Sequence, residues 1–178
     1  MIEKSPPKTL LFIIRLIDFT VGEWSGKLFA WLIVPMIGGI TYEVFARYLF
    51  NAPTILAYDI TYMLYGSHFM LGAAYTLYKR GHIRTDFFYS NWSPRVQGRV
   101  DAISYLLFFF PGMLFFLLAG WDEALYSWSI LEKSDASPWR PPLYPFKSVI
   151  PFTAFLLLLQ GVSEFLKSAY AALRGEWL

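Results

Sequence analysis

The residues whose chemistry stands out are charged and polar groups set inside apolar segments. Glu43 and Arg47 stand four residues apart with the acid first, the order that favours an ion pair on one helix face. Asp59 opens the next apolar segment, so one arginine is expected between two carboxylates, either pinning a hairpin or facing a partner protein. Gln160 and Glu164, also four apart, are expected to satisfy each other or the headgroup region.

The two histidines do not suggest a cofactor site. A b-type haem anchor needs axial ligands such as histidines from facing helices. His68 lies near the middle of an apolar segment and His82 in a polar loop, so we do not expect both to reach one iron. A lone histidine at membrane depth is more often a hydrogen-bond partner between helices than a metal ligand.

Other chemical signatures are missing from the sequence. It has no cysteine, and it shows no glycine-rich phosphate loop and no carboxylate–histidine metal pattern. We therefore expect no enzymatic activity, no cofactor and no metal site. The net charge of +2 is too small to imply a nucleic-acid partner.

Two loops are candidate contact surfaces. The polar loop 79–86 contains His82, Arg84 and Asp86. A solvated, positively charged loop would account for the arginines but not for His82 and Asp86. The longer loop 122–147 is rich in prolines, which stiffen the chain, and in aromatic side chains, which offer apolar contact. It either binds a partner or returns to the membrane with its aromatic side chains at the interface.

Long apolar segments position these residues. Of the 178 residues, 56% are hydrophobic and only 16% are charged, whereas a soluble domain has about 25% charged residues. A bilayer core about 30 Å thick needs about 20 apolar residues as helix. Uncharged runs near this length predict an all-α integral membrane protein. It would be one domain, 1–178, with transmembrane helices at about 28–49, 59–79, 100–121 and 147–166.

A helical arm, residues 8–23, precedes the first predicted span. Apolar side chains at helical spacing lie on one face, and Lys8, Arg15, Asp18 and Gly22 lie on the other. This pattern predicts an amphipathic helix in the membrane interface, with a plain extension of the first span as the alternative. Eleven of the 15 lysines and arginines fall in residues 1–27, the 79–99 loop and the C-terminal segment, which predicts that both termini are cytoplasmic.

Local signals place some boundaries and bends. Ser93 followed by Pro94 predicts the start of the third long helix, because serine caps helices and proline suits their first position. Pro111 with Gly112 predicts a kink within that helix, and Pro35 predicts another in the first span.

Several pieces, taken in order, resemble the small four-helix membrane subunit of TRAP (tripartite ATP-independent periplasmic) transporters, the DctQ-like permease component. The resemblance runs from about residue 31 to 164. Its pieces are YEVFARY at 42–48, an acid at Asp59, LGAA at 71–74, GHIRTD at 81–86, the proline-rich outer loop and LLLLQGVSE at 156–164. Members of that family commonly open the second span with Trp-Ser-Glu-Glu. This chain has Leu-Ala-Tyr-Asp there, so only the role of the last acid can be carried over.

The resemblance implies a division of labour in the inner membrane. A periplasmic binding protein captures an organic acid or similar solute, and a large many-helix subunit carries it across by an elevator-like motion, usually driven by sodium. The small subunit is a fixed scaffold, paired one to one with the large subunit and surrounded by lipid. It would hold neither the solute nor the coupling ion.

The same resemblance suggests roles for the candidate residues. His82 and Asp86, with Arg84 between them, would anchor the cytoplasmic loop against the large subunit. Arg47, with Glu43 and Asp59, would order the outer hairpin near the docking face. Two other classes remain open on sequence alone: a haem- or quinone-associated anchor subunit of a respiratory complex, and a stand-alone small exporter that forms a homo-oligomer.

Overall fold

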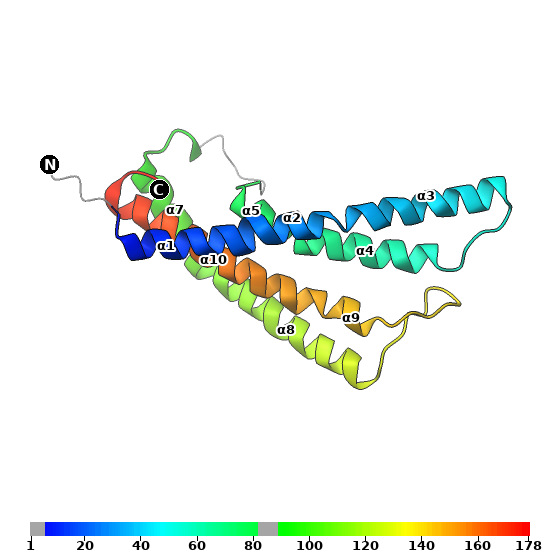
Figure 1. Ribbon diagram of the computed structural model, residues 1–178. Helices are drawn as coiled ribbons and strands as arrows, with labels where there is room; N and C mark the ends of the chain where they lie inside the picture. Colours follow the sequence, from blue (N-terminus) through cyan, green and yellow to red (C-terminus); the bar gives the residue numbers. More distant parts are fainter. Residues whose placement is uncertain (1–5, 82–88) are drawn as a thin grey trace.

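The computed structural model describes residues 6–81 and 89–178, and throughout this part the regular structure is helical. Four long helical segments run back and forth along the molecule (Figure 1). The first comprises α1 (Lys8–Ile17), η1 (Asp18–Trp24), α2 (Ser25–Ala30) and α3 (Ile33–Leu49), and the second α4 (Ala57–Leu71) and α5 (Ala73–Tyr78). The third comprises α7 (Pro94–Ser104), η2 (Tyr105–Phe109) and α8 (Phe110–Ser129), and the fourth α9 (Tyr144–Lys147) and α10 (Val149–Arg174).

Three of these segments are long and apolar enough to cross a membrane: Lys8–Leu49, Pro94–Ser129 and Tyr144–Arg174. The second segment, where we predicted another span, is divided into α4 and α5 at Gly72. The two helices stay joined by helical hydrogen bonds, because the Gly72 amide donates to His68 at 3.1 Å and the Thr76 amide donates to Gly72 at 3.0 Å. The prediction of an all-helical membrane protein is thus supported, with three spans that meet the length criterion.

The predicted arm and first span form one helical run. Within it, η1 is a π-helical stretch, and the turn at Trp31 and Leu32 tightens just before Pro35. Because proline has no amide hydrogen, the Trp31 carbonyl cannot receive its usual α-helical hydrogen bond. It accepts instead from the Val34 amide at 3.1 Å. Whether residues 8–23 lie in the membrane interface remains a prediction.

The third segment begins as predicted, with Ser93 extended (φ −64°, ψ 151°) and Pro94 as the first helical residue. It ends later than predicted, because α8 continues to Ser129 and so includes the first eight residues of the expected loop 122–147. Near Pro111, where we predicted a kink, the helix contains the π-helical segment η2 immediately before α8.

Helix α10 is the centre of the packing, because it contacts α1, α4, α5, α7 and α8. Glycines bring the helices close. A Cβ added at Gly98 would lie 2.5 Å from the Ala172 backbone nitrogen, so α7 and α10 are in backbone contact at this glycine. In η1 and α2, Gly22 and Gly26 lie against the rings of Tyr78 and Tyr75. Such small contacts let helices pack in a membrane, where burying apolar surface from water contributes little.

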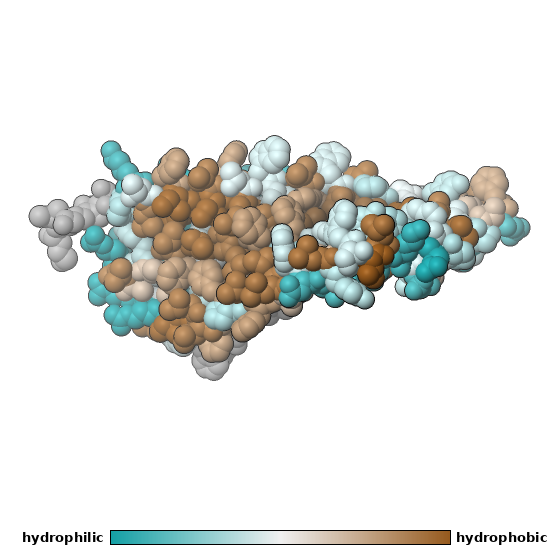
Figure 2. Space-filling model, turned by 90° about the horizontal axis from the view of Figure 1, so that it is seen from below, coloured by the Kyte–Doolittle hydropathy of each residue, from teal (hydrophilic) through white to brown (hydrophobic). Residues whose placement is uncertain are grey.

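The surface of the protein is apolar over much of its area. Figure 2 shows broad brown patches with hydrophilic side chains gathered mainly toward the ends. By contrast, the buried apolar core is small and centres on Val21, Leu71, Ala74 and Leu156. A soluble protein would bury far more of its large apolar side chains, so this distribution suits a protein surrounded by lipid or by partner helices.

We predict that Gly98→Ala destabilises the chain by about 1–3 kcal/mol, because the new methyl group would overlap the α10 backbone and force the helices apart. Gly38→Ala is the matched control, since a Cβ there meets nothing within 4 Å. Thermal unfolding of the purified chain in detergent compares the two. Equal unfolding temperatures would contradict the close contact between α7 and α10.

Candidate functional site

The strongest concentration of charge lies where η1, the end of α5 and α10 meet. Lys167 places its ammonium 2.8 Å from Asp18 Oδ2 and 2.5 Å from Glu164 Oε1. Gln160 Nε2 and Ser163 Oγ donate to Asp18 Oδ1 at 2.9 and 2.6 Å. We call this group, with Arg80, the inner polar cluster: Asp18, Arg80, Gln160, Ser163, Glu164 and Lys167.

Arg80 connects the inner polar cluster to the loop that follows α5. Its Nε lies 3.6 Å from Glu164 Oε2, and its guanidinium lies over the ring of Trp177, 4.6 Å from the centroid. Arg80 also has a left-handed backbone (φ 53°), which non-glycine residues rarely adopt. These contacts fix the direction in which the chain leaves α5.

The inner polar cluster corrects two sequence-based expectations. Asp18 was assigned to the polar face of an interfacial helix, but it bonds to α10, and its neighbours Val21 and Gly22 are buried. Gln160 and Glu164 were expected to satisfy each other or the headgroup region, but Gln160 donates to Asp18 and Glu164 pairs with Lys167. The reason is that Asp18 of η1 supplies an acceptor for Gln160, while Lys167, one turn further along α10, supplies a cation for Glu164.

His68 makes a contact between helices, as expected for a lone histidine at this depth. Its Nδ1 lies 3.2 Å from the Phe29 carbonyl, so this nitrogen must carry the proton and donate it. The Phe29 carbonyl also accepts from the Leu32 amide in the tightened turn before Pro35. His68 therefore helps to hold α4 against the bend in the first segment.

The predicted ion pair at the outer end of α3 is present. Arg47 donates to Glu43 Oε1 through Nε at 3.0 Å and through Nη2 at 2.5 Å. Glu43 Oε2 accepts from the Thr54 amide at 3.0 Å and from the Thr54 hydroxyl. Glu43 thus joins α3 to the chain entering α4, which is the structural pin that we considered, although its partner across the turn is Thr54.

Asp59 does not join this pair. It is 1% exposed and accepts from Ser134 Oγ at 2.7 Å and from Ser137 Oγ. Both serines lie in the loop between α8 and α9, which we call the outer loop. The expected arrangement of Arg47 between two carboxylates is therefore wrong, because Asp59 binds the loop between α8 and α9 and not Arg47. The acid at this position attaches the outer loop to the beginning of α4.

A second ionic group holds the base of the outer loop. Lys147 Nζ lies 2.6 Å from Glu123 Oε1 on α8 and 2.6 Å from Glu132 Oε2 in the loop. The Leu143 amide donates to the Glu132 carbonyl at 2.8 Å, and the Ser134 amide donates to Pro141 at 2.8 Å. The hydrogen bond from Lys147 holds the pKa of the Glu132 carboxyl below its ordinary value.

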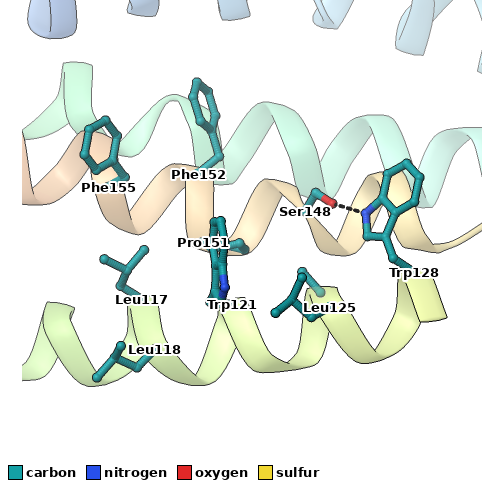
Figure 3. Close-up of a pocket in the computed structure, with 10 residues that line it drawn as sticks. Leu117, Leu118, Trp121, Leu125, Trp128, Ser148, Pro151, Phe152 and Phe155 are labelled. Atoms are coloured by element: carbon teal, nitrogen blue, oxygen red, sulfur yellow. Dashed lines mark hydrogen bonds between the residues drawn. The ribbon is translucent and has the colours of Figure 1, made fainter.

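An apolar groove lies between α8 and α10. Figure 3 shows Leu117, Trp121 and Leu125 of α8 pointing toward α10, with Pro151 beside Trp121, and Trp128 Nε1 donates to Ser148 Oγ at 2.8 Å. Its volume is about 610 Å³. No ionisable side chain lines it, and its one hydroxyl, that of Ser148, is engaged with Trp128 and with the Tyr144 carbonyl.

The remaining predicted site residues, His82, Arg84 and Asp86, lie outside the described residues, so their anchoring role remains a prediction. Among residues 6–81 and 89–178, no group of three or more His, Asp or Glu side chains is placed to hold a metal ion. The polar groups that are described act mainly between helices and loops.

Comparison with known proteins identifies the family. A family model described as "Tripartite ATP-independent periplasmic transporters, DctQ component" matches residues 36–170, most of the chain. The chain belongs to the DctQ family. Neither a curated protein nor a solved structure gives a significant match.

Membership in the DctQ family makes this chain a membrane component of a tripartite transporter, which also has a large membrane subunit and a periplasmic binding protein. A transporter component is consistent with a chain that is not an enzyme. The comparison favours neither the respiratory anchor nor the stand-alone exporter.

We predict that Asp18→Ala destabilises this DctQ-family chain by about 1–3 kcal/mol, because it leaves the buried Gln160 amide and Ser163 hydroxyl without their acceptor. Asp18→Asn, which keeps an acceptor oxygen, should be affected less. Asp135→Ala is the control, because the Asp135–Arg140 pair is exposed and exposed pairs contribute little. Equal effects of Asp18→Ala and Asp135→Ala on thermal unfolding would contradict this account.

The Glu132–Lys147 contact predicts a dependence on pH. Because the folded pKa of Glu132 is lowered, its contribution to stability is fully present above the unfolded pKa of about 4.3 and is lost as the pH falls through the folded value. We expect Glu132→Gln to unfold at a lower temperature than the parent at pH 7. The difference should shrink below about pH 4. A constant difference across this range would rule out the carboxylate as its cause.

Proposed function

We propose that this chain is the small scaffold subunit of a secondary-active TRAP transporter in the inner membrane. It would pair one to one with the large transport subunit and help to dock the solute-binding protein during ion-coupled uptake of an organic acid or similar solute. The observation that carries the proposal is the match to the DctQ component over residues 36–170.

The contacts of the ionisable groups support a scaffold. Lys167 is neutralised by Asp18 and Glu164, and Asp59 is bonded to two serines. Groups that bind or carry a solute in a membrane are expected to face a cavity or pathway. Here the charged groups at depth hold helices and loops together. The coupling ion, which we expect to be sodium, and the solute would bind the large subunit, with no cofactor in this chain.

Topology completes the proposal. With both termini cytoplasmic, the α3–α4 turn and the outer loop would face the periplasm, where the binding protein approaches. The inner polar cluster and the loop containing His82, Arg84 and Asp86 would face the cytoplasm, where they would contact the large subunit. The counts of lysine and arginine on the two sides support this orientation.

Co-purification tests the proposal directly. The tagged chain, expressed from its native operon, should bring down a large many-helix membrane protein at one-to-one stoichiometry, identified by mass spectrometry. Purification of the chain by itself as a well-defined homo-oligomer would contradict the scaffold function and favour the exporter.

We predict that Arg47→Ala lowers solute uptake or the yield of the membrane complex, because Arg47 braces Glu43 at the outer end of α3. The affinity of the isolated binding protein for its solute should not change. Transport assays in proteoliposomes and complex yield measure the first effect, and calorimetry measures the second. Normal uptake together with a normal yield would remove Arg47 from the assembly function.

A further inference from the structure

An open groove lies between α2 and the segment formed by α4 and α5. Its volume is about 520 Å³, and most of its surface is apolar. Small residues leave room for it, namely Gly26 and Ala30 on the first segment with Gly72 and Ala73 on the second. Sites for small molecules commonly have volumes of about 300–1,000 Å³, so this groove is large enough to hold part of a ligand.

The two ends of this groove differ in polarity. At one end lies the exposed ring of Phe69, beside His68, whose Nδ1 is already engaged with the Phe29 carbonyl. At the other end lie Lys27 and Thr76. Phe69 and Thr76 are seven residues apart, which is about 10 Å along a helix. The groove therefore changes from apolar to charged along the direction in which the second segment runs.

The spacing of charged residues places the charged end at the edge of the hydrocarbon core. Lys27 precedes Arg47 by 20 residues on the first segment, and Asp59 precedes Lys79 by 20 residues on the second. Twenty helical residues span about 30 Å, which is the thickness of the core. Lys27 and Lys79 therefore mark the same boundary on two neighbouring segments, and the groove runs from this boundary into the core.

Two ammonium groups with open donors lie at the charged end. The ammonium of Lys79 lies 5.6 Å from the ring centre of Tyr75, which lines the groove, and 4.7 Å from that of Tyr78. Within the described part of the chain, Lys79 makes no ion pair. Lys27 pairs with Glu23 at 2.6 Å, but its side chain is 68% exposed, and an ammonium group has three donors. Two lysines against one glutamate leave this end positively charged.

We propose that this groove binds one anionic phospholipid, with its phosphate at Lys27 and Lys79 and one acyl chain along Gly72 and Ala73 toward Phe69. A phospholipid has the same order of parts, a negative phosphate at the boundary and apolar chains within the core. Basic pockets between helices on the cytoplasmic side of a membrane bind anionic headgroups. The choice of the inner leaflet rests on the proposed orientation of the chain. The binding itself requires neither that orientation nor the large subunit.

Lipid titration of the purified chain tests the charged end. The delipidated chain in a mild detergent is titrated with phosphatidylglycerol or with phosphatidylcholine of the same acyl chains, which has no net charge, and native mass spectrometry counts the bound lipids. We expect one phosphatidylglycerol to bind at least tenfold more tightly than phosphatidylcholine. Lys27→Gln combined with Lys79→Gln should remove this preference. Equal binding of the two lipids to the unmodified chain would overturn the proposal.

A second double variant controls for total charge. Lys8→Gln combined with Arg174→Gln removes the same charge from exposed positions at the end of the molecule where α1 begins and α10 ends (Figure 1). This variant should keep the preference for phosphatidylglycerol. If both double variants lose the preference equally, total charge attracts the lipid and the assignment of the site is overturned.

Ala30→Phe tests the apolar part of the groove. Ala30 is exposed and lines the groove, so a phenylalanine there would occupy the path of the acyl chain. Ile37→Phe is the matched control, because it places the same side chain on α3 outside the groove. Ala30→Phe should weaken binding of phosphatidylglycerol at least tenfold, and Ile37→Phe should not. Binding that Ala30→Phe leaves unchanged would mean that the lipid is held at the surface, and would overturn the groove as its site.

A measurement on the unmodified chain does not depend on the folding of variants. Phosphatidylglycerol with a photoreactive diazirine in one acyl chain is added to the chain by itself and to the chain expressed with the large subunit, and mass spectrometry maps the cross-linked residues. Cross-links should fall on Ala30 and residues 69–73 in both samples. Cross-links confined to other parts of the chain would overturn the site. Cross-links in the groove that disappear with the large subunit present would assign the groove to that subunit and overturn the choice of ligand.

Discussion

The interaction on which the rest of the structure depends is the contact of Lys167 with Asp18 and Glu164. An ammonium group close to hydrocarbon is costly unless it is neutralised, and here two carboxylates from different segments lie within 2.8 Å of it. The remaining oxygen of Asp18 is satisfied by Gln160 and Ser163. Because the partners belong to η1 and α10, the first and last helical segments must meet at this level. Arg80, reached through Glu164, places the end of the second segment there as well.

Once the segments meet at this level, the sizes of the side chains between them decide how closely the helices pack. Lipid tails are as apolar as leucine, so large side chains gain little by leaving lipid for the protein interior. Close contact and polar groups decide the association instead. Gly98 lets α7 touch the α10 backbone, and Gly161 lies against the ring of Phe109. The long apolar side chains are left to face outward, which explains why the buried core is small although the chain is mostly hydrophobic.

Features that depend on residues nearby in the chain could be predicted from the sequence. Contacts between residues far apart in the chain could not. The start of α7 at Pro94 and the Glu43–Arg47 pair follow from local spacing, and the structure confirms them. The role of Asp59 does not, because its partner Ser134 lies 75 residues away. Asp18 and Gln160 are 142 residues apart. A single acid in an amphipathic pattern gives no sign of whether it faces water or another helix.

The charged groups bind partners within the chain, and this limits what such a subunit can contribute to transport. A group that binds a solute or ion must exchange its partners during each cycle. Asp18, Glu164 and Asp59 instead connect elements whose separation would disturb the fold, so their partners cannot be exchanged without cost. A rigid body of this kind can act on transport only through its shape and its surfaces. The two outer surfaces are both mixed in character. The outer loop is tied to α4 through Asp59 and exposes the Asp135–Arg140 pair beside Leu131 and Trp139. The turn pinned by Glu43 exposes Arg47 beside Tyr48 and Phe50. Each surface therefore offers a partner protein apolar contact area together with charged groups that can fix its orientation.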